Sequence, residues 1–213
     1  MEVERTLPLK EYLTAAGPAE AEIIIKRSRF IAHLSPAASV EEAEDFIAAV
    51  RARHSQASHN VPAFSVGLEV ETQRASDDGE PSGTAGRPVL EVIKKSGLRD
   101  VAIVVTRYFG GILLGAGGLL RAYGQAASAA VTAAGLRRLV LHRTVLVSVD
   151  YPLFGKVQKE IERLGLAIEG VDCLEKVTVK VAVPVDAVPV FKGRMIDLTK
   201  ARAGLEEGPA GYR

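Results

Sequence analysis

VAIVVTRYFGGILLGAGGLLRAY, residues 101–123, is the stretch that decides the fold of this chain. It opens with a run of β-branched residues over 101–107, which is typical of a strand buried on both faces. A glycine-rich turn follows over residues 110–118, and an alanine-rich helix is expected over 119–134, with Gly135 ending it. Strand, glycines and helix in this order aim backbone N–H groups at one point, which predicts an anion site.

A second glycine block, RASDDGEPSGTAGRP, lies upstream over residues 74–88. It falls in an expected loop over residues 73–88, which is followed by a short helix over 89–95. Asp77, Asp78 and Glu80 lie close together in it. Carboxylate oxygens suit Mg²⁺ and can do acid–base work. Asp, Ser and Gly in this order also build hydrogen-bonded turns. The turn is the commoner role, so the acidic loop alone does not predict a metal.

Before these blocks the apolar pattern predicts two strands and a helix. Residues 22–34 open with three isoleucines and then alternate, so we expect one strand over this range. Ser39 followed by Glu42 is a capping box, which predicts a helix from Val40 onward. Residues 61–70 alternate again and are expected as a second strand.

The C-terminal third has the element order of a ferredoxin-like domain. We expect strands over 143–150, 166–172, 177–183 and 205–212, and helices over 154–164 and 186–200, the second one broken near Pro189 and Gly193. This β-α-β-β-α-β order is the split βαβ pattern. The sequence therefore predicts an α+β protein with an N-terminal α/β domain over 1–138 and a ferredoxin-like domain over 139–213.

Composition excludes several classes of protein. The chain has 213 residues and a formal net charge of +1, which argues against a broad basic surface for bulk nucleic-acid binding. Cys173 is the single cysteine, so no intrachain disulfide forms, which fits a cytoplasmic location. The charged N-terminus lacks the apolar run of a signal peptide, and we expect no membrane span.

Two arginines accompany the second block. Arg107 ends the strand and Arg121 lies one turn into the helix, and each could pair with a phosphate or carboxylate bidentately. The glycine spacing is that of a Walker A loop without its Lys-Ser/Thr, so NTP hydrolysis by that mechanism is not expected. The glycines could equally serve a tight turn and close packing. His54 and His59 are five apart, which is the wrong spacing for a helical zinc pair.

Three segments resemble the IMPACT/YigZ family. They are HSQASHNVPAF (54–64), RASDDGEPSGTAGRPVLEV (74–92) and VVTRYFGGILLGAGGLLRAY (104–123). The resemblance departs at Val61-Pro62, where a cysteine or a similar small residue is expected after the His-Asn pair. It also departs at Ile112-Leu113, which is apolar where relatives often carry a polar residue.

The resemblance implies an N-terminal domain with the α/β fold of the second domain of a ribosomal small-subunit protein, also found in elongation factor G and GHMP kinases. It implies a C-terminal domain similar to the last domain of elongation factor G. Eukaryotic members regulate translation through a ribosome-associated activator of an initiation-factor kinase, with an additional N-terminal module not expected here. For bacterial-type members the resemblance suggests binding to nucleic acid or to the ribosome.

The first hypothesis is a non-enzymatic protein that binds RNA, the ribosome or a ribosome-associated protein and is linked to the regulation of translation. Arg107, Arg121 and the glycine-loop amides would hold phosphates, with Arg74 and Arg87 as outer contacts. The full set of candidate binding residues is Arg74, Asp77, Asp78, Glu80, Arg87, Arg107, Tyr108, Gly110, Gly111, Gly115, Gly117, Gly118 and Arg121.

The alternative is a phosphate- or nucleotide-binding enzyme. In GHMP kinases a glycine-rich turn before a helix cradles the nucleotide, and residues 115–118 are similar in placement. Asp77, Asp78 and Glu80 would then hold Mg²⁺ or act as a base, whereas the binding hypothesis needs no cofactor. Catalysis requires these carboxylates and the arginines to converge in one concave pocket. A third reading is that both blocks only stabilise the fold.

Overall fold

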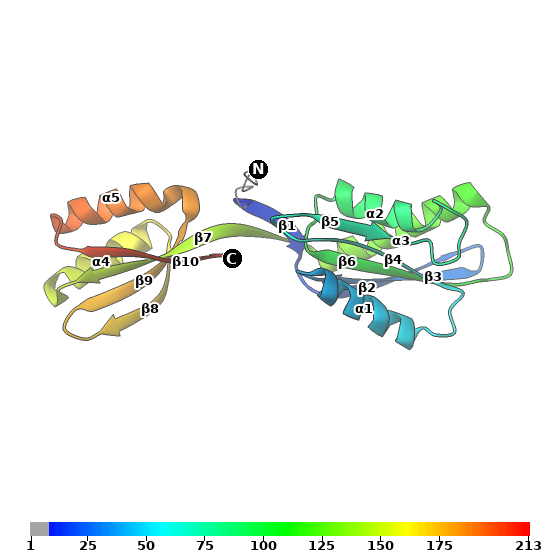
Figure 1. The fold of residues 1–213 in the computed structure, drawn as a ribbon, viewed down its shortest axis with the longest axis horizontal. Helices are drawn as coiled ribbons and strands as arrows, with labels where there is room; N and C mark the ends of the chain where they lie inside the picture. The colour runs from blue at the N-terminus through cyan, green and yellow to red at the C-terminus, as the bar shows by residue number, and fades with distance from the viewer. Residues whose placement is uncertain (1–8) are drawn as a thin grey trace, which may run out of the picture. The chain divides into compact units, whose positions relative to one another are not determined.

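The computed structural model describes residues 9–213 as a mixed α+β protein with two sheets and five α-helices (Figure 1). The predicted α+β class is confirmed. The chain divides into two compact units, Met1–Arg138 and Leu139–Arg213, which we call unit 1 and unit 2. Within residues 9–213, no helix is both long and apolar enough to cross a bilayer.

Unit 1 is built on a five-stranded antiparallel sheet whose spatial order differs from the chain order. Its strands, in spatial order, are β2 (Ala19–Ile25), β3 (Ser28–Pro36), β6 (Val101–Tyr108), β4 (His59–Val66) and β5 (Thr72–Ala75). The β-branched run of β6 is the central strand, and residues 101–107 are all buried, as predicted. The short strand β1 (Glu11–Ala15) pairs instead with β7 (Leu136–Val149).

Helices cover both faces of this sheet. On one face α1 (Val40–Arg53) buries Ala43, Ile47 and Val50 against apolar residues of β4 and β6. Ser39 caps this helix as predicted, because its Oγ accepts a hydrogen bond from the N–H of Glu42 at 3.2 Å. The Glu42 carboxylate accepts from the N–H of Ala38 at 2.7 Å rather than from that of Ser39. On the other face lie α2 (Gly86–Lys95) and α3 (Ala116–Ala134), with the alanines of α3 packed closely on the sheet.

The expected single strand over residues 22–34 is wrong, because β2 and β3 form a hairpin. Ile25 pairs with Ser28 across a two-residue turn, and both turn residues have positive φ, 46° for Lys26 and 66° for Arg27. Hairpin turns of this kind favour Asn-Gly, so Lys-Arg gave no turn signal. The inward-facing positions do change from odd-numbered Ile23 to even-numbered Phe30, which a continuous strand cannot do.

Smaller differences follow from local backbone chemistry. The expected loop over residues 73–88 begins inside β5, and α2 starts at Gly86 rather than Val89. Helix α3 starts at Ala116, before the predicted Leu119, because glycines at its start are compatible with the helical backbone. It ends as predicted at Gly135, which has φ 67°.

Unit 2 has the predicted β-α-β-β-α-β order. Its elements after β7 are α4 (Tyr151–Arg163), β8 (Ala167–Cys173), β9 (Val177–Pro184), α5 (Val188–Thr199) and β10 (Gly204–Tyr212), and the antiparallel strands lie in the order β10-β7-β9-β8. Alternate valines of β7 and β9 bury one sheet face beneath α4 and α5. The predicted break in α5 is wrong. Pro189 lies in the first turn, where its missing N–H costs nothing, and the helix continues through Gly193.

Candidate functional site

Four connections of unit 1 meet at the edge of the sheet where β6 ends, at the right of Figure 1. Strand pairing brings them together, because Arg29 faces Tyr108 and His59 faces Arg107 in the antiparallel registers. We call this region the loop end of unit 1. It consists of the β2–β3 turn (residues 26–27), the α1–β4 connection (54–58), the β5–α2 connection (76–85) and the β6–α3 connection (109–115). Both glycine blocks therefore lie at the same end of one sheet.

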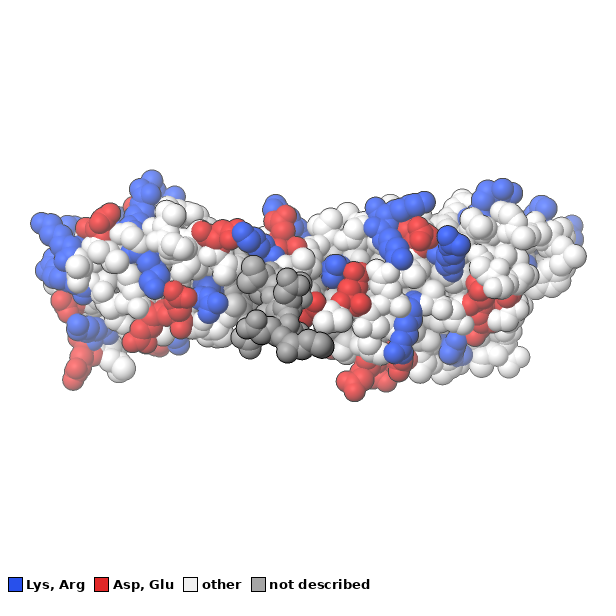
Figure 2. Space-filling model, turned by 45° about the horizontal axis from the view of Figure 1, so that its top comes forward, with Lys and Arg blue, Asp and Glu red and all other residues white. Residues whose placement is uncertain are grey.

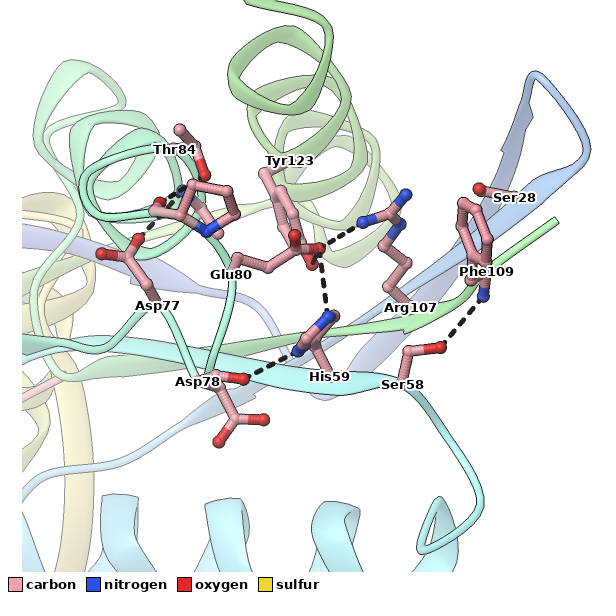
Figure 3. A network of polar contacts seen from close by, with 12 residues as sticks. Ser28, Ser58, His59, Asp77, Asp78, Glu80, Thr84, Arg107, Phe109 and Tyr123 are labelled. Carbon is pink, nitrogen blue, oxygen red and sulfur yellow. Dashed lines mark hydrogen bonds and ion pairs between the residues drawn. The ribbon is translucent and has the colours of Figure 1, made fainter. Parts of the chain in front are cut away.

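At the centre of the loop end, Glu80 is a buried carboxylate that joins three elements (Figure 3). Its Oε1 accepts hydrogen bonds from Nη1 of Arg107 at 2.6 Å and from the hydroxyl of Tyr123 at 2.7 Å. Nε2 of His59 lies 3.8 Å from the same oxygen. The exposed fractions of Glu80, Arg107 and Tyr123 are 8%, 5% and 0%. Glu80 thus ties the β5–α2 connection to β6 and α3.

The hydroxyl of Tyr123 stays protonated in this cluster. Burial, and then the hydrogen bond to Glu80, raises the pKa of Tyr123 far above its ordinary value. The hydroxyl is therefore a permanent donor to the carboxylate. The Tyr123 ring packs edge-on against Phe30, with ring centroids 5.2 Å apart. This cluster fixes the position of α3 over the sheet by specific polar contacts as well as by apolar packing.

Arg107, expected as a phosphate ligand, lies inside unit 1 instead. Its guanidinium carbon is 5.5 Å from the ring centroid of Phe30 and 5.4 Å from that of Phe109. Its Nε is buried and finds no hydrogen-bond partner among residues 9–213. Because its charge is paired with Glu80 and shielded from solvent, Arg107 is suited to supporting the β6–α3 connection rather than to binding a ligand at the surface.

Two serine hydroxyls and one close contact fix the start of the β6–α3 connection. The N–H of Phe109 donates to Ser58 Oγ at 3.2 Å, and the N–H of Gly110 donates to Ser28 Oγ at 3.1 Å. A Cβ on Gly110 would lie 2.1 Å from the carbonyl carbon of Arg27. Only glycine lets the connection approach the β2–β3 turn this closely.

The other candidate glycines line the exposed path into α3. Gly111 and Gly115 have φ of 81° and 71°, and Gly115 is the N-cap of α3. The first N–H groups of a helix have no intrahelical partner, and in α3 no side chain caps them either. Gly117 and Gly118 lie in the first turn. The predicted order of a strand, a glycine-rich connection and a helix N-terminus is therefore present here.

Asp77 builds the β5–α2 connection. Its two carboxylate oxygens accept hydrogen bonds from the N–H groups of Gly83 at 2.8 Å, Ala85 at 3.0 Å and Gly86 at 2.8 Å. Although burial raises the pKa of Asp77, these three bonds outweigh it and hold the pKa below its ordinary value. The carboxylate is turned toward backbone of its own connection, which is the hydrogen-bonded turn that the sequence pattern favoured.

Asp78 serves a different set of partners. Its Oδ2 accepts from the N–H of Asn60 at 2.7 Å, and its Oδ1 accepts from Nη2 of Arg51 at 2.9 Å. Its carbonyl oxygen accepts from Nδ1 of His59 at 2.8 Å, which leaves Nε2 of that ring to face Glu80. Within residues 9–213, no group of three His, Cys, Asp or Glu side chains is placed to hold a metal. The three acidic residues therefore do not converge on one point.

Tyr108 and His54 lie on the α1 side of the sheet. The Tyr108 hydroxyl is 2.9 Å from Nδ1 of His54, the C-cap residue of α1. The His54 ring lies 4.8 Å from that of buried His33, centroid to centroid. Burial lowers the pKa of His33 to about 4 and also lowers the pKa of His54, so both rings are neutral near pH 7. These residues anchor the end of α1.

The remaining arginines differ in availability. Arg74 on β5 pairs with Glu44 of α1 at 2.8 Å and lies over the ring of Phe64, on the α1 face. Arg87 lines a groove of about 620 Å³ between α2 and α3, and Arg121 projects beside Gly117. Arg87 and Arg121 are exposed.

Four basic residues at or beside the loop end carry exposed charges without an ion-pair partner among residues 9–213. They are Lys26, Arg27, Arg87 and Arg121. The same region exposes Phe109, Ile112, Leu113 and Leu120. Figure 2 shows basic side chains separated by uncharged surface at the right-hand end of unit 1. The loop end therefore presents cations, backbone N–H groups and apolar side chains to solvent.

Comparison with known proteins assigns the chain to a family. Residues 26–131 match the family described as the Impact N-terminal domain, and residues 147–202 match a domain of unknown function, DUF1949. The IMPACT family member YvyE of Bacillus subtilis is 41% identical over 96% of this chain and 94% of its own length. The chain belongs to the IMPACT family.

Other relatives and a solved structure match this chain over different shares of its length. YigZ of Escherichia coli is 34% identical over 92% of this chain and 98% of its own length. The Protein IMPACT of Rattus norvegicus is 33% identical over 45% of this chain and 31% of its own length. A solved structure titled as that of a hypothetical protein covers 92% of this chain and 97% of its own, with 33% identity and a TM-score of 0.62. The Impact N-terminal match includes all four connections of the loop end.

Sequence reasoning missed several residues of this IMPACT site. The histidine spacing gives no sign that His59 faces Glu80. Tyr123 carries a signal, because a tyrosine on the buried face of a helix usually needs a hydrogen-bond partner. The expected strand over residues 22–34 includes Lys26 and Arg27. The change in the phase of the inward-facing residues between Ile23 and Phe30 was the signal that could have revealed their turn.

Proposed function

We propose that this IMPACT-family protein binds RNA, free or within the ribosome, through the loop end of unit 1, and that this binding serves the regulation of translation in the cytoplasm. One observation carries the proposal. Lys26, Arg27, Arg87 and Arg121 are exposed, and within residues 9–213 none of their charges is paired. Lys and Arg side chains and backbone N–H groups are the groups that contact nucleic-acid phosphates.

The arrangement of the acidic residues favours binding over catalysis. The enzyme hypothesis needs Asp77, Asp78 and Glu80 to act on one bound phosphate. Asp77 accepts three backbone hydrogen bonds, Asp78 accepts from Asn60 and Arg51, and Glu80 accepts from buried partners. A carboxylate that is held in this way has few lone pairs left for a ligand. We therefore propose a role without a catalytic step or a resident metal.

The small net charge limits the strength of the electrostatic contribution. With a formal net charge of +1, the protein gains little from long-range attraction, so a few local contacts must dominate. Three or four phosphate contacts predict a slope of about −2 to −3 in a plot of log binding constant against log salt for single strands.

Fold analogy supports the same partner class. We propose that unit 1 has the α/β fold of the second domain of a ribosomal small-subunit protein, and that unit 2 is ferredoxin-like and similar to the last domain of elongation factor G. Both folds recur in proteins that act on the ribosome. This support is an analogy between folds, and function has to be argued from the site itself.

The test measures binding to purified ribosomes by co-sedimentation and to labelled RNA by fluorescence anisotropy, each across a salt titration. The variant Lys26→Gln/Arg27→Gln/Arg121→Gln removes three exposed charges from the loop end. We expect salt-sensitive binding by the unmodified protein, with a slope smaller by about 2 in the variant, because three phosphate contacts are lost.

A matched control removes charge elsewhere in unit 1. Lys94 and Lys95 are exposed in the last turn of α2, at the other end of that helix from the loop end. The variant Lys94→Gln/Lys95→Gln should bind as the unmodified protein does. Absence of any ribosome or RNA binding at low salt, or equal losses in the two variants, would refute the proposed function.

A further inference from the structure

We infer that the RNA bound at the loop end is single-stranded and that one of its unpaired bases stacks on Phe109. The inference rests on the proposed function and deepens it, because it names the form of RNA and the side chain that receives a base. It is carried by the placement of one exposed aromatic ring among unpaired cations.

Phe109 is exposed but firmly held. Its exposed fraction is 48%, while the other Phe and Tyr side chains described in unit 1 are buried or half-buried. Its N–H donates to Ser58, and its ring lies against the guanidinium of Arg107, which is itself fixed by Glu80. A large apolar ring that is kept at the surface by buried polar groups is suited to stacking, because little side-chain freedom is lost on binding.

The β2–β3 turn brings two cationic residues next to the backbone of the connection that carries this ring. Gly110, the residue after Phe109, contacts the backbone of Arg27. Lys26 and Arg27 both adopt positive φ, which is uncommon for residues other than glycine, where Asn-Gly would fit without strain. Strained residues of this kind concentrate at functional sites. A phosphate on either side of a stacked base would find these charges within reach.

The exposed ring of Phe109, together with the neighbouring cations, favours single-stranded RNA over a duplex or an acidic peptide. The faces of paired bases are hidden inside a duplex, so an exposed ring can stack only on an unpaired base. An acidic peptide would use the cations but would leave Phe109 without a specific partner. The neighbouring Ile112 and Leu113 are exposed apolar side chains that can contact a base or a ribose.

The chain has no tryptophan, which permits a direct test. The variant Phe109→Trp places a single tryptophan at the proposed stacking position, and Tyr151→Trp places one at an exposed position of α4 in unit 2. We expect the fluorescence of the Phe109→Trp protein to be quenched by a single-stranded RNA of mixed sequence. The same length of duplex RNA should quench it far less, and Tyr151→Trp should respond to neither.

Affinity measurements on the full-length chain complete the test. Removing one stacked base contact by Phe109→Ala should weaken single-strand binding by about 5- to 150-fold, without changing the salt slope. Phe109→Tyr should restore binding, and Val70→Ala, which removes an exposed apolar side chain from the connection between β4 and β5, should leave binding nearly unchanged. Circular dichroism and thermal unfolding verify that each variant is folded.

The inference and the proposed function fail in different ways. Salt-sensitive RNA binding that is equal for single and double strands, and insensitive to Phe109→Ala, would overturn the inference and leave the proposed function standing. Absence of all RNA and ribosome binding by the unmodified protein would overturn both. An acidic peptide such as polyglutamate that binds as tightly as RNA, with no effect of Phe109→Ala, would also overturn the inference.

Discussion

The two glycine blocks lie at the same end of one sheet, yet they differ in where their polar groups point. In the first block the side chains of Asp77, Asp78 and Glu80 face protein donors, and Glu80 is buried. In the second block residues 111–113 and 115–117 are exposed. The acidic residues of the first block, which suggested a catalytic or metal-binding role, therefore stabilise the internal network of unit 1. The glycines and apolar residues of the second block form the exposed surface.

The largest expected effect on stability comes from removing the charge of Glu80, at the centre of this internal network. Glu80→Gln keeps the shape of the side chain but leaves the buried guanidinium of Arg107 without a counter-charge, which should destabilise the protein by about 3–5 kcal/mol. Urea unfolding followed by circular dichroism measures this. The control Glu44→Gln breaks the exposed pair with Arg74 and should cost at most about 1 kcal/mol. Equal effects of the two changes would mean that Glu80 is not the structural centre that we describe.

The next effect tests the contact between the second block and the β2–β3 turn. Gly110→Ala would place a Cβ 2.1 Å from the carbonyl carbon of Arg27, so the turn and the connection must separate. We expect a destabilisation of about 1–3 kcal/mol together with weaker RNA binding. Gly117→Ala, whose Cβ would be no closer than 3.8 Å to another group, should leave stability unchanged or raise it by up to about 1 kcal/mol. Tolerance of alanine at Gly110 would contradict the close approach.

A smaller effect on stability depends on pH and comes from Asp77 in the first block. The folded-state pKa of Asp77 lies below its ordinary value, so its contribution to stability is present above the unfolded pKa, about 3.9, and is lost as the pH falls through the folded pKa. Asp77→Ala should cost about 1 kcal/mol near neutral pH, as for the loss of a helix cap. The difference from the unmodified protein should shrink as the pH falls below about 4. A difference that stays constant down to low pH would show that the carboxylate charge is irrelevant.

The smallest effect on stability has the opposite sign. Lys26→Asn/Arg27→Gly supplies the residues that a two-residue hairpin prefers, and it should raise stability by about 0.5–1 kcal/mol by relieving two positive φ angles. The same change should weaken RNA binding, because two exposed charges are lost. A variant that is more stable and binds RNA as before would separate the strain in this turn from function.

Local patterns predicted most of the fold. The capping box at Ser39, the β-branched run of β6 and Gly135 after α3 each act within a few residues, so they can be recognised in a single sequence. The Lys26-Arg27 turn was missed because its residues contradict the usual turn chemistry and are held by the neighbouring Gly110. The continuity of α5 through Gly193 was missed because packing of its apolar face outweighs the weak preference of glycine against helix.

The candidate site was less predictable because its contacts join distant parts of the chain. Glu80 bonds Arg107 and Tyr123, which are 27 and 43 residues away, and no local pattern encodes such a pairing. The acidic loop and the arginines suggested a ligand, and the sequence could not reveal that several of these charges neutralise one another inside the protein. The placement of the exposed glycine connection, by contrast, followed from the strand–glycine–helix order.

Amide hydrogen exchange with and without single-stranded RNA, read by mass spectrometry, tests the contrast between the two blocks most directly. We expect the added RNA to slow exchange in peptides covering residues 111–117 and 26–27, because these residues lie at the proposed binding surface and most of them are exposed. Exchange in residues 77–86 should not change, since their N–H groups already serve the internal network. RNA-dependent protection confined to residues 77–86, or to unit 2, would contradict the account.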